Sequence, residues 1–186
     1  MNKNYLNNKG LTLVELLAVI ILISFIGIFS FSLIVQSTET TRQIQIESNM
    51  RDEADIIVSQ LMKTLYETRQ NQIIENQTGT GFSYLNVTTD PSKCRRDEIT
   101  GAWIVDQPCR NTFEKIGFET QGTTTRLIIK GESYHISNTN IKILNDSKII
   151  GNPTSQNSYE ILLKLEYSGR KETSKSMEFK NIIQPF

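Results

Sequence analysis

The chain of 186 residues is long enough for one globular domain joined to a helix, and a second full domain is not expected. Its 20 basic and 20 acidic residues give a net charge of zero, without the excess of lysine and arginine that is typical of a nucleic-acid-binding surface. A single histidine, scattered acidic residues and the lack of a glycine-rich phosphate loop argue against an enzyme, and no cofactor is expected.

The chain begins with a polar leader, residues 1–10, followed by an apolar segment, residues 11–35. As a helix this segment would rise about 37 Å, against a hydrocarbon core of roughly 30 Å, so it is long enough to span a membrane with some tilt. Lys3 and Lys9 precede the segment and favour a cytoplasmic amino terminus. We therefore expect a single-pass membrane protein whose remaining residues lie outside the cytoplasm.

Glu15 is the only charged residue within the apolar segment. Placing a carboxylate in hydrocarbon costs on the order of 2.5–3.5 kcal/mol even on a lenient insertion scale, so Glu15 needs a compensating partner. Ionisable residues inside a membrane are functional by default. This favours a role for Glu15 over the alternative of a plain anchor that carries a stray acidic residue.

The sequence KGLTLVELL, residues 9–17, resembles the processing site of type IV pilins, a family that includes the pseudopilins of type II secretion and competence systems. The resemblance implies that a prepilin peptidase cuts between Gly10 and Leu11, and that the new amino group of Leu11 is methylated. Most members of the family have Phe at the position of Leu11. A secretory signal peptide differs, because its cut follows the apolar region and removes it.

Cleavage after Gly10 would place an α-amino group about one helical turn from Glu15. We expect Glu15 to pair with this amine in its own or an adjacent subunit, which would set the register of stacked helices during filament assembly. The family implies further partners: other pilins or pseudopilins, the prepilin peptidase, an assembly platform protein and, through it, an ATPase. Membrane lipid would surround the helix before assembly, and nucleic acid is not indicated as a partner.

Residues 36–75 are predicted to continue the helix as an amphipathic segment. After a polar stretch, residues 36–45, apolar residues recur at spacings of three and four, as on one buried helix face. They are Ile46, Met50, Ala54, Ile57, Val58, Leu61, Met62 and Leu65. No proline precedes Pro91, so nothing forces a break, and we expect one helix from about residue 12 to about residue 72.

Residues 76–186 are predicted to form a β-rich head, because turn-forming residues accumulate near residues 71–81 and strand-like segments follow. The predicted strands are residues 82–87, 102–105, 112–118, 124–130, 133–137, 141–144 with 148–150, 159–167 and 173–183. Short turns between them favour an antiparallel meander. A long helix packed on such a sheet gives an α+β fold, and relatives among the type IV pilins have this arrangement.

The two cysteines, Cys94 and Cys109, are predicted to form a disulfide, because the head is expected in an oxidising compartment. Closing a loop of about 15 residues would stabilise the head by roughly 3 kcal/mol in the chain-entropy model. Two free thiols are the alternative in a reducing habitat. A zinc site lacks a CxxC spacing and a second histidine beside His135, and the nearby acidic residues lack a calcium-loop pattern. Trp103, within the same loop, is expected to pack in the core, and an exposed Trp103 would instead mark a contact with a partner.

Two classes of function remain. The first is a minor pilin or pseudopilin, a structural subunit that moves from the cell membrane into a type IV pilus, a type II secretion pseudopilus or a competence filament at the cell surface or in the periplasm. The second is a membrane-anchored extracytoplasmic binding protein that does not enter a filament. The first class loses residues 1–10 to the peptidase, and the second keeps them.

Overall fold

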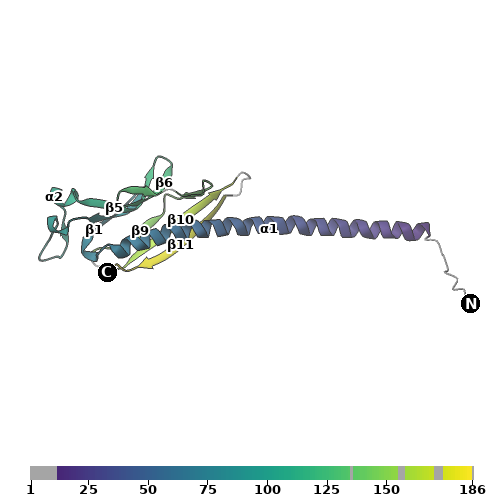
Figure 1. Cartoon of the computed structure of the whole chain (residues 1–186), viewed down its shortest axis with the longest axis horizontal. Coiled ribbons are helices and arrows are strands. Elements are labelled where there is room, and N and C mark those ends of the chain that lie inside the picture. The colour runs from purple at the N-terminus through teal and green to yellow at the C-terminus, as the bar shows by residue number, and fades with distance from the viewer. Residues whose placement is uncertain (1–11, 135, 155–157, 170–173, 186) are drawn as a thin grey trace, which may run out of the picture. The chain divides into compact units, whose positions relative to one another are not determined.

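The computed structural model describes residues 12–134, 136–154, 158–169 and 174–185. The chain divides into two compact units, residues 1–45 and residues 46–186. One helix, α1 (Leu13–Glu67), runs from the first unit into the second (Figure 1). The prediction of one uninterrupted helix across the apolar and amphipathic segments is confirmed.

Helix α1 ends at Glu67, several residues before the expected end near residue 72. Thr68 closes the last turn, since its backbone N–H and its Oγ1 both donate to the carbonyl of Thr64, at 3.1 and 2.8 Å. A 3₁₀ turn (Gln70–Gln72) follows, and strand β1 (Ile73–Gly79) then occupies residues that were expected to be helix end and loop. The two isoleucines that begin β1 are β-branched, which favours an extended backbone over a helical one.

The described part of the second unit contains a nine-stranded antiparallel sheet, in which neighbours along the main path are β1-β2-β5-β6-β8-β10-β11. Strand β7 pairs with β6, and β9 pairs with β10. The remaining strands of this sheet are β2 (Phe82–Thr88), β5 (Phe113–Gln121), β6 (Thr124–Ile129), β7 (Glu132–Tyr134), β8 (Ile141–Ile143), β9 (Lys148–Ile150), β10 (Tyr159–Ser168) and β11 (Ser174–Ile183).

A smaller structure lies between β2 and β5. It contains a 3₁₀ turn (Pro91–Lys93), a two-stranded ribbon of β3 (Arg95–Arg96) and β4 (Trp103–Ile104), and the one-turn helix α2 (Gln107–Arg110). Every predicted strand has a counterpart, although the counterparts of residues 102–105 and 133–137 are shorter than expected. Strands β1 and β3 were not predicted.

Strands β8 and β9 act as one interrupted strand beside β10. Ile143 lies opposite Leu165 of β10, and Lys148 lies opposite Leu162, so both segments pair with the same edge. Between them, the backbone N–H of Lys164 donates to the hydroxyl of Ser147 at 3.0 Å instead of to a strand carbonyl. The side chain of a turn residue thus completes the pairing across the interruption.

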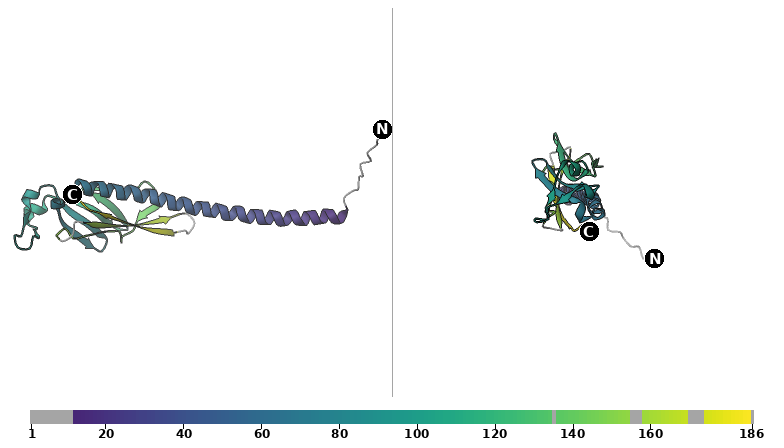
Figure 2. Two further views of the ribbon diagram at one scale, coloured as in Figure 1. Left: turned by 90° about the horizontal axis from the view of Figure 1, so that it is seen from below. Right: turned by 90° about the vertical axis from the view of Figure 1, so that its left-hand side faces the viewer.

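The core of the second unit lies between the sheet and residues 46–67 of α1, which run along it in Figures 1 and 2. The predicted apolar stripe of this helix is buried except for Met62, which is partly buried. In β10 the predicted alternation is confirmed, because Ile161, Leu163 and Leu165 are fully buried. Burial of these faces is the main force holding helix and sheet together.

Gly117 of β5 is needed for close pairing with β2. Its φ is 150°, and a Cβ atom at this position would lie 2.3 Å from the carbonyl oxygen of Ser83 and 2.6 Å from the Cα of Tyr84. Any other residue would push the two strands apart at this point.

Candidate functional sites: an apolar helix with one carboxylate, and a disulfide-bonded loop

Thr12 and Glu15 form a reciprocal cap at the start of α1. Oε2 of Glu15 accepts hydrogen bonds from the backbone N–H and from Oγ1 of Thr12, both at 2.9 Å. In return, the backbone N–H of Glu15 points to Oγ1 of Thr12 at 3.3 Å. This is a capping box, in which a Thr at the cap and a Glu three residues later satisfy each other's backbone donors. The Thr-x-x-Glu spacing is visible in the sequence, but we predicted only that Glu15 pairs with the new α-amino group of its own or an adjacent subunit.

The capping box leaves part of the carboxylate available. Both bonds from Thr12 reach the same oxygen, Oε2, and no described residue donates to Oε1 of Glu15. A cation from another chain can therefore approach Oε1 without displacing the cap. Gly10 and Leu11, the predicted cleavage and methylation site, lie outside the described residues.

The apolar part of α1 has no partner within the chain. Its large apolar side chains, from Leu13 to Val35, are between 45% and 79% exposed. Residues 16–38 carry no charge, and as a helix they rise about 34 Å, enough for a hydrocarbon core of roughly 30 Å. By length and composition this is a candidate membrane anchor.

Polar side chains within the apolar part bond to their own helix. The hydroxyl of Ser24 donates to the carbonyl of Ile20, and that of Thr38 donates to the carbonyl of Ile34, each at 2.8 Å. Such bonds satisfy hydroxyl groups where no water is available. Glu15 is thus the only side chain in this part that carries a full charge.

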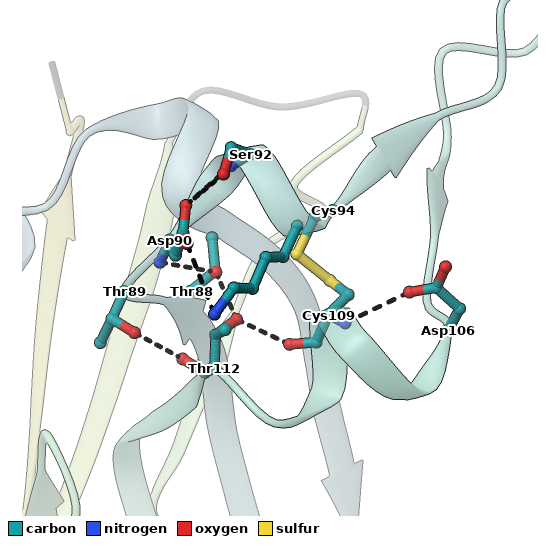
Figure 3. Close-up of polar contacts among 9 residues, drawn as sticks. Thr88, Thr89, Asp90, Ser92, Cys94, Asp106, Cys109 and Thr112 are labelled. Carbon is teal, nitrogen blue, oxygen red and sulfur yellow. Dashed lines mark hydrogen bonds and ion pairs between the residues drawn. A yellow bond between two sulfur atoms is a disulfide. The ribbon is translucent and has the colours of Figure 1, made fainter.

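A disulfide joins Cys94 and Cys109, as predicted, with the two Cα atoms 4.7 Å apart. Figure 3 shows the bond together with the polar contacts that close the base of the loop. There, the hydroxyls of Thr88 and Thr112 lie 2.6 Å apart, and the backbone N–H of Thr89 donates to the carbonyl of Thr112 at 3.0 Å. The loop is therefore fixed to the sheet by hydrogen bonds as well as by a covalent bond.

Three aspartates cap the short turns of this loop. Asp90 accepts from the backbone N–H of Ser92, Asp97 from that of Thr100, and Asp106 from that of Cys109, at 3.1, 2.8 and 3.2 Å. These bonds lower the pKa of each aspartate: the Ser92 hydroxyl contributes most for Asp90, and backbone N–H groups contribute most for the other two. Asp90, Asp97 and Asp106, three of the four acidic residues considered as calcium ligands, thus have structural partners in their own loop, and the fourth, Glu98, has none among the described residues.

Trp103 is half-buried and contacts two different groups, the disulfide cluster and Arg96. It packs against a small cluster formed by Ile74, Cys94 and Cys109 but is only partly buried, so the expectation of a core position is met in part. The guanidinium carbon of Arg96 lies 4.3 Å from the centre of the ring, a cation–π contact that stiffens the two-stranded ribbon. This contact and the two residue pairs of β3 and β4 hold the ribbon together.

No protein-family model matches this chain, and no curated protein or solved structure was found to be similar to it.

Proposed function

We propose that this chain is a minor pilin or pseudopilin, a structural subunit that is processed between Gly10 and Leu11 and assembled into a filament through α1. The observation that carries the proposal is the exposed, charge-free run of residues 16–38, which begins directly after a capped Glu15 and continues into a folded α+β unit. A helix that only anchored the chain would gain a cap from Glu15 but would have no use for its second carboxylate oxygen and its charge. A helix that packs in register against copies of itself would gain a specific contact.

The proposed role of Glu15 has two parts, and the structure suggests how to separate them. Oε2 caps the helix through Thr12, whereas Oε1 is free to accept from the amine of Leu11 on a neighbouring subunit. Glu15→Gln keeps a side-chain oxygen for the cap but removes the charge. Glu15→Val removes both. Glu39→Gln, at the first acidic residue after the apolar run, is the matched control.

The experiment is co-expression with a prepilin peptidase and the other filament components. All variants should insert in the membrane and lose the mass of residues 1–10, because the cut lies outside the capping box. Only the two Glu15 variants should fail to enter filaments. If Glu15→Gln assembles as well as the native chain, the amine pairing is wrong and Glu15 serves only as a cap. A native chain that keeps residues 1–10 would refute the proposal as a whole.

The disulfide-bonded loop favours a second candidate, an extracytoplasmic binding protein held by a simple anchor. The loop presents Ile99 and Ile104 to solvent on a stiff ribbon, which suits the capture of a partner. Such a protein would act from the membrane with residues 1–10 still attached. The same mass measurement therefore distinguishes the two candidates.

A further inference from the structure

The turn at the tip of the two-stranded ribbon exposes an isoleucine to solvent. Ile99 is 94% exposed, and its backbone N–H donates to Oδ1 of Asp97 at 3.0 Å. The same oxygen accepts from the N–H and hydroxyl of Thr100, and the N–H of Gly101 donates to the carbonyl of Asp97 at 2.9 Å. Four hydrogen bonds thus stabilise the turn that presents Ile99, and a stabilised turn loses less entropy when it binds a partner.

The charge beside Ile99 is not used within the chain. Glu98 is exposed and forms no ion pair with any described residue. Asp97, by contrast, is committed to capping the turn. The tip therefore offers an apolar side chain flanked by a carboxylate that has no partner in its own copy.

A cavity with apolar and basic lining residues lies beside the shortest strand pairing of the sheet. Strands β6 and β8 are joined by a single residue pair, Thr125 opposite Ile143, and a cavity of about 290 Å³ lies beside this pair. Its apolar lining comes from Tyr134, Ile136, Ile141 and Ile143. At ~30 Å³ for each water-sized group, the four carbons of an isoleucine side chain need about 120 Å³, which the cavity can hold.

Two cations also line this cavity, Arg126 and Lys142. Neither forms an ion pair with a carboxylate of the described residues. The guanidinium of Arg126 has only a long bond, 3.4 Å, to the amide oxygen of Gln121. The carboxylates opposite these cations in the neighbouring strands, Glu119 and Glu166, accept instead from Lys115 and Ser174, at 2.9 and 2.8 Å. The two cations therefore place positive charge beside an apolar cavity, as Glu98 places negative charge beside Ile99 at the tip.

We infer that the ribbon tip of one copy docks into this cavity of a second copy, with Ile99 inside and Glu98 against Arg126 and Lys142. Tip and cavity are different surfaces of the same chain, so the contact is heterologous: it can repeat from copy to copy, as a helical filament requires, instead of closing into a two-fold dimer. Such a contact would link the heads of neighbouring subunits. The inference rests on the proposed filament function.

The test places a photo-reactive aliphatic amino acid that carries a diazirine and is about the size of isoleucine at Ile99 of the full-length chain, assembled with its native partners in membranes. We expect a light-dependent adduct of two copies whose linked peptide contains residues 134–143. The same probe at Thr154, in an exposed turn that does not line this cavity, is the matched control and should give no such adduct. An adduct to a different protein, or to another part of a second copy, overturns the inference, as does the absence of any adduct.

Charge reversal tests the complementarity separately. Glu98→Lys and Lys142→Glu should each lower the yield of the adduct by about fivefold, the size of a strong surface ion pair, and the double variant should restore it. Lys63→Glu, at an exposed lysine of α1, should leave the yield unchanged. Loss without restoration in the double variant would refute the pairing. Because Glu15 dependence is scored by filament incorporation, failure of this contact is distinguishable from failure of the filament proposal.

Discussion

The disulfide allows a quantitative test of how the loop is held. Replacing both Cys94 and Cys109 with alanine opens a loop whose ends are 15 residues apart in sequence. The chain-entropy model then predicts a loss of about 3 kcal/mol in the free energy of unfolding. Cys109 is fully buried and Cys94 nearly so, both in contact with the cluster around Ile74. Removing their sulfur atoms therefore shifts the stability in the same direction.

The measurement is urea unfolding of the full-length chain in detergent, followed by the fluorescence of Trp103. This is the only tryptophan in the chain and it packs on the disulfide cluster, so its signal reports the unit that contains the loop. With a urea dependence of about 2 kcal/mol per molar, the expected loss lowers the midpoint by about 1.5 M.

Reductant is the matched control for this prediction. It should lower the midpoint of the native chain toward that of the double alanine variant and should leave the variant itself unchanged. A midpoint difference below about 0.3 M would correspond to less than ~0.6 kcal/mol. That result would show that the hydrogen bonds at the base of the loop, and not the disulfide, hold it in place.

Two further predictions concern the head. Gly117→Ala should lower the free energy of unfolding by roughly 1–3 kcal/mol, because the new Cβ would meet the carbonyl oxygen of Ser83. Gly122→Ala, in a turn with open space around it, is the control and should lower this free energy by less. Urea unfolding of the two variants measures the difference. The pKa of Asp97 is lowered mainly by the backbone N–H of Thr100, so its contribution to stability is complete above the unfolded pKa of about 3.9 and is lost as pH falls through the folded pKa. The protection factor of the Thr100 amide, which is its exchange rate relative to that of an unstructured peptide at the same pH, should therefore fall in acid. Asp97→Asn, which keeps the acceptor oxygen, should abolish that fall, and an unchanged acid response in the variant would rule out Asp97 as its source.

Much of the fold follows from local patterns in the sequence. The spacing of apolar residues in α1 and the alternation in β10 both predict which side chains are buried, because each element hides one face and local geometry determines which residues share it. The disulfide was predictable from the number of cysteines and their expected compartment. The Thr-x-x-Glu spacing of Thr12 and Glu15 also predicts the capping box, beside the pairing with an α-amino group that we predicted for Glu15.

The parts that local patterns did not predict depend on distant residues. Most of β1 is polar and reads as a loop, yet its side chains find partners far along the chain. The amide nitrogen of Asn76 donates to the carbonyls of Ile149 and Gly151 at 3.0 and 2.8 Å, and Oε1 of Glu75 accepts from Asn86 at 2.7 Å. These contacts stabilise a strand that intrinsic propensity disfavours. Strand order likewise depends on contacts between residues that are remote in sequence.

The insertion of the disulfide-bonded structure between β2 and β5 has an evolutionary consequence. These two strands are direct neighbours, with Thr88 opposite Phe113, so the sheet is already continuous where the excursion leaves and returns. The disulfide and the hydrogen bonds at its base close this segment, so its sequence can diverge or lengthen while β2 and β5 keep their pairing. Selection can therefore change the exposed surface of this segment with little effect on the fold of the sheet.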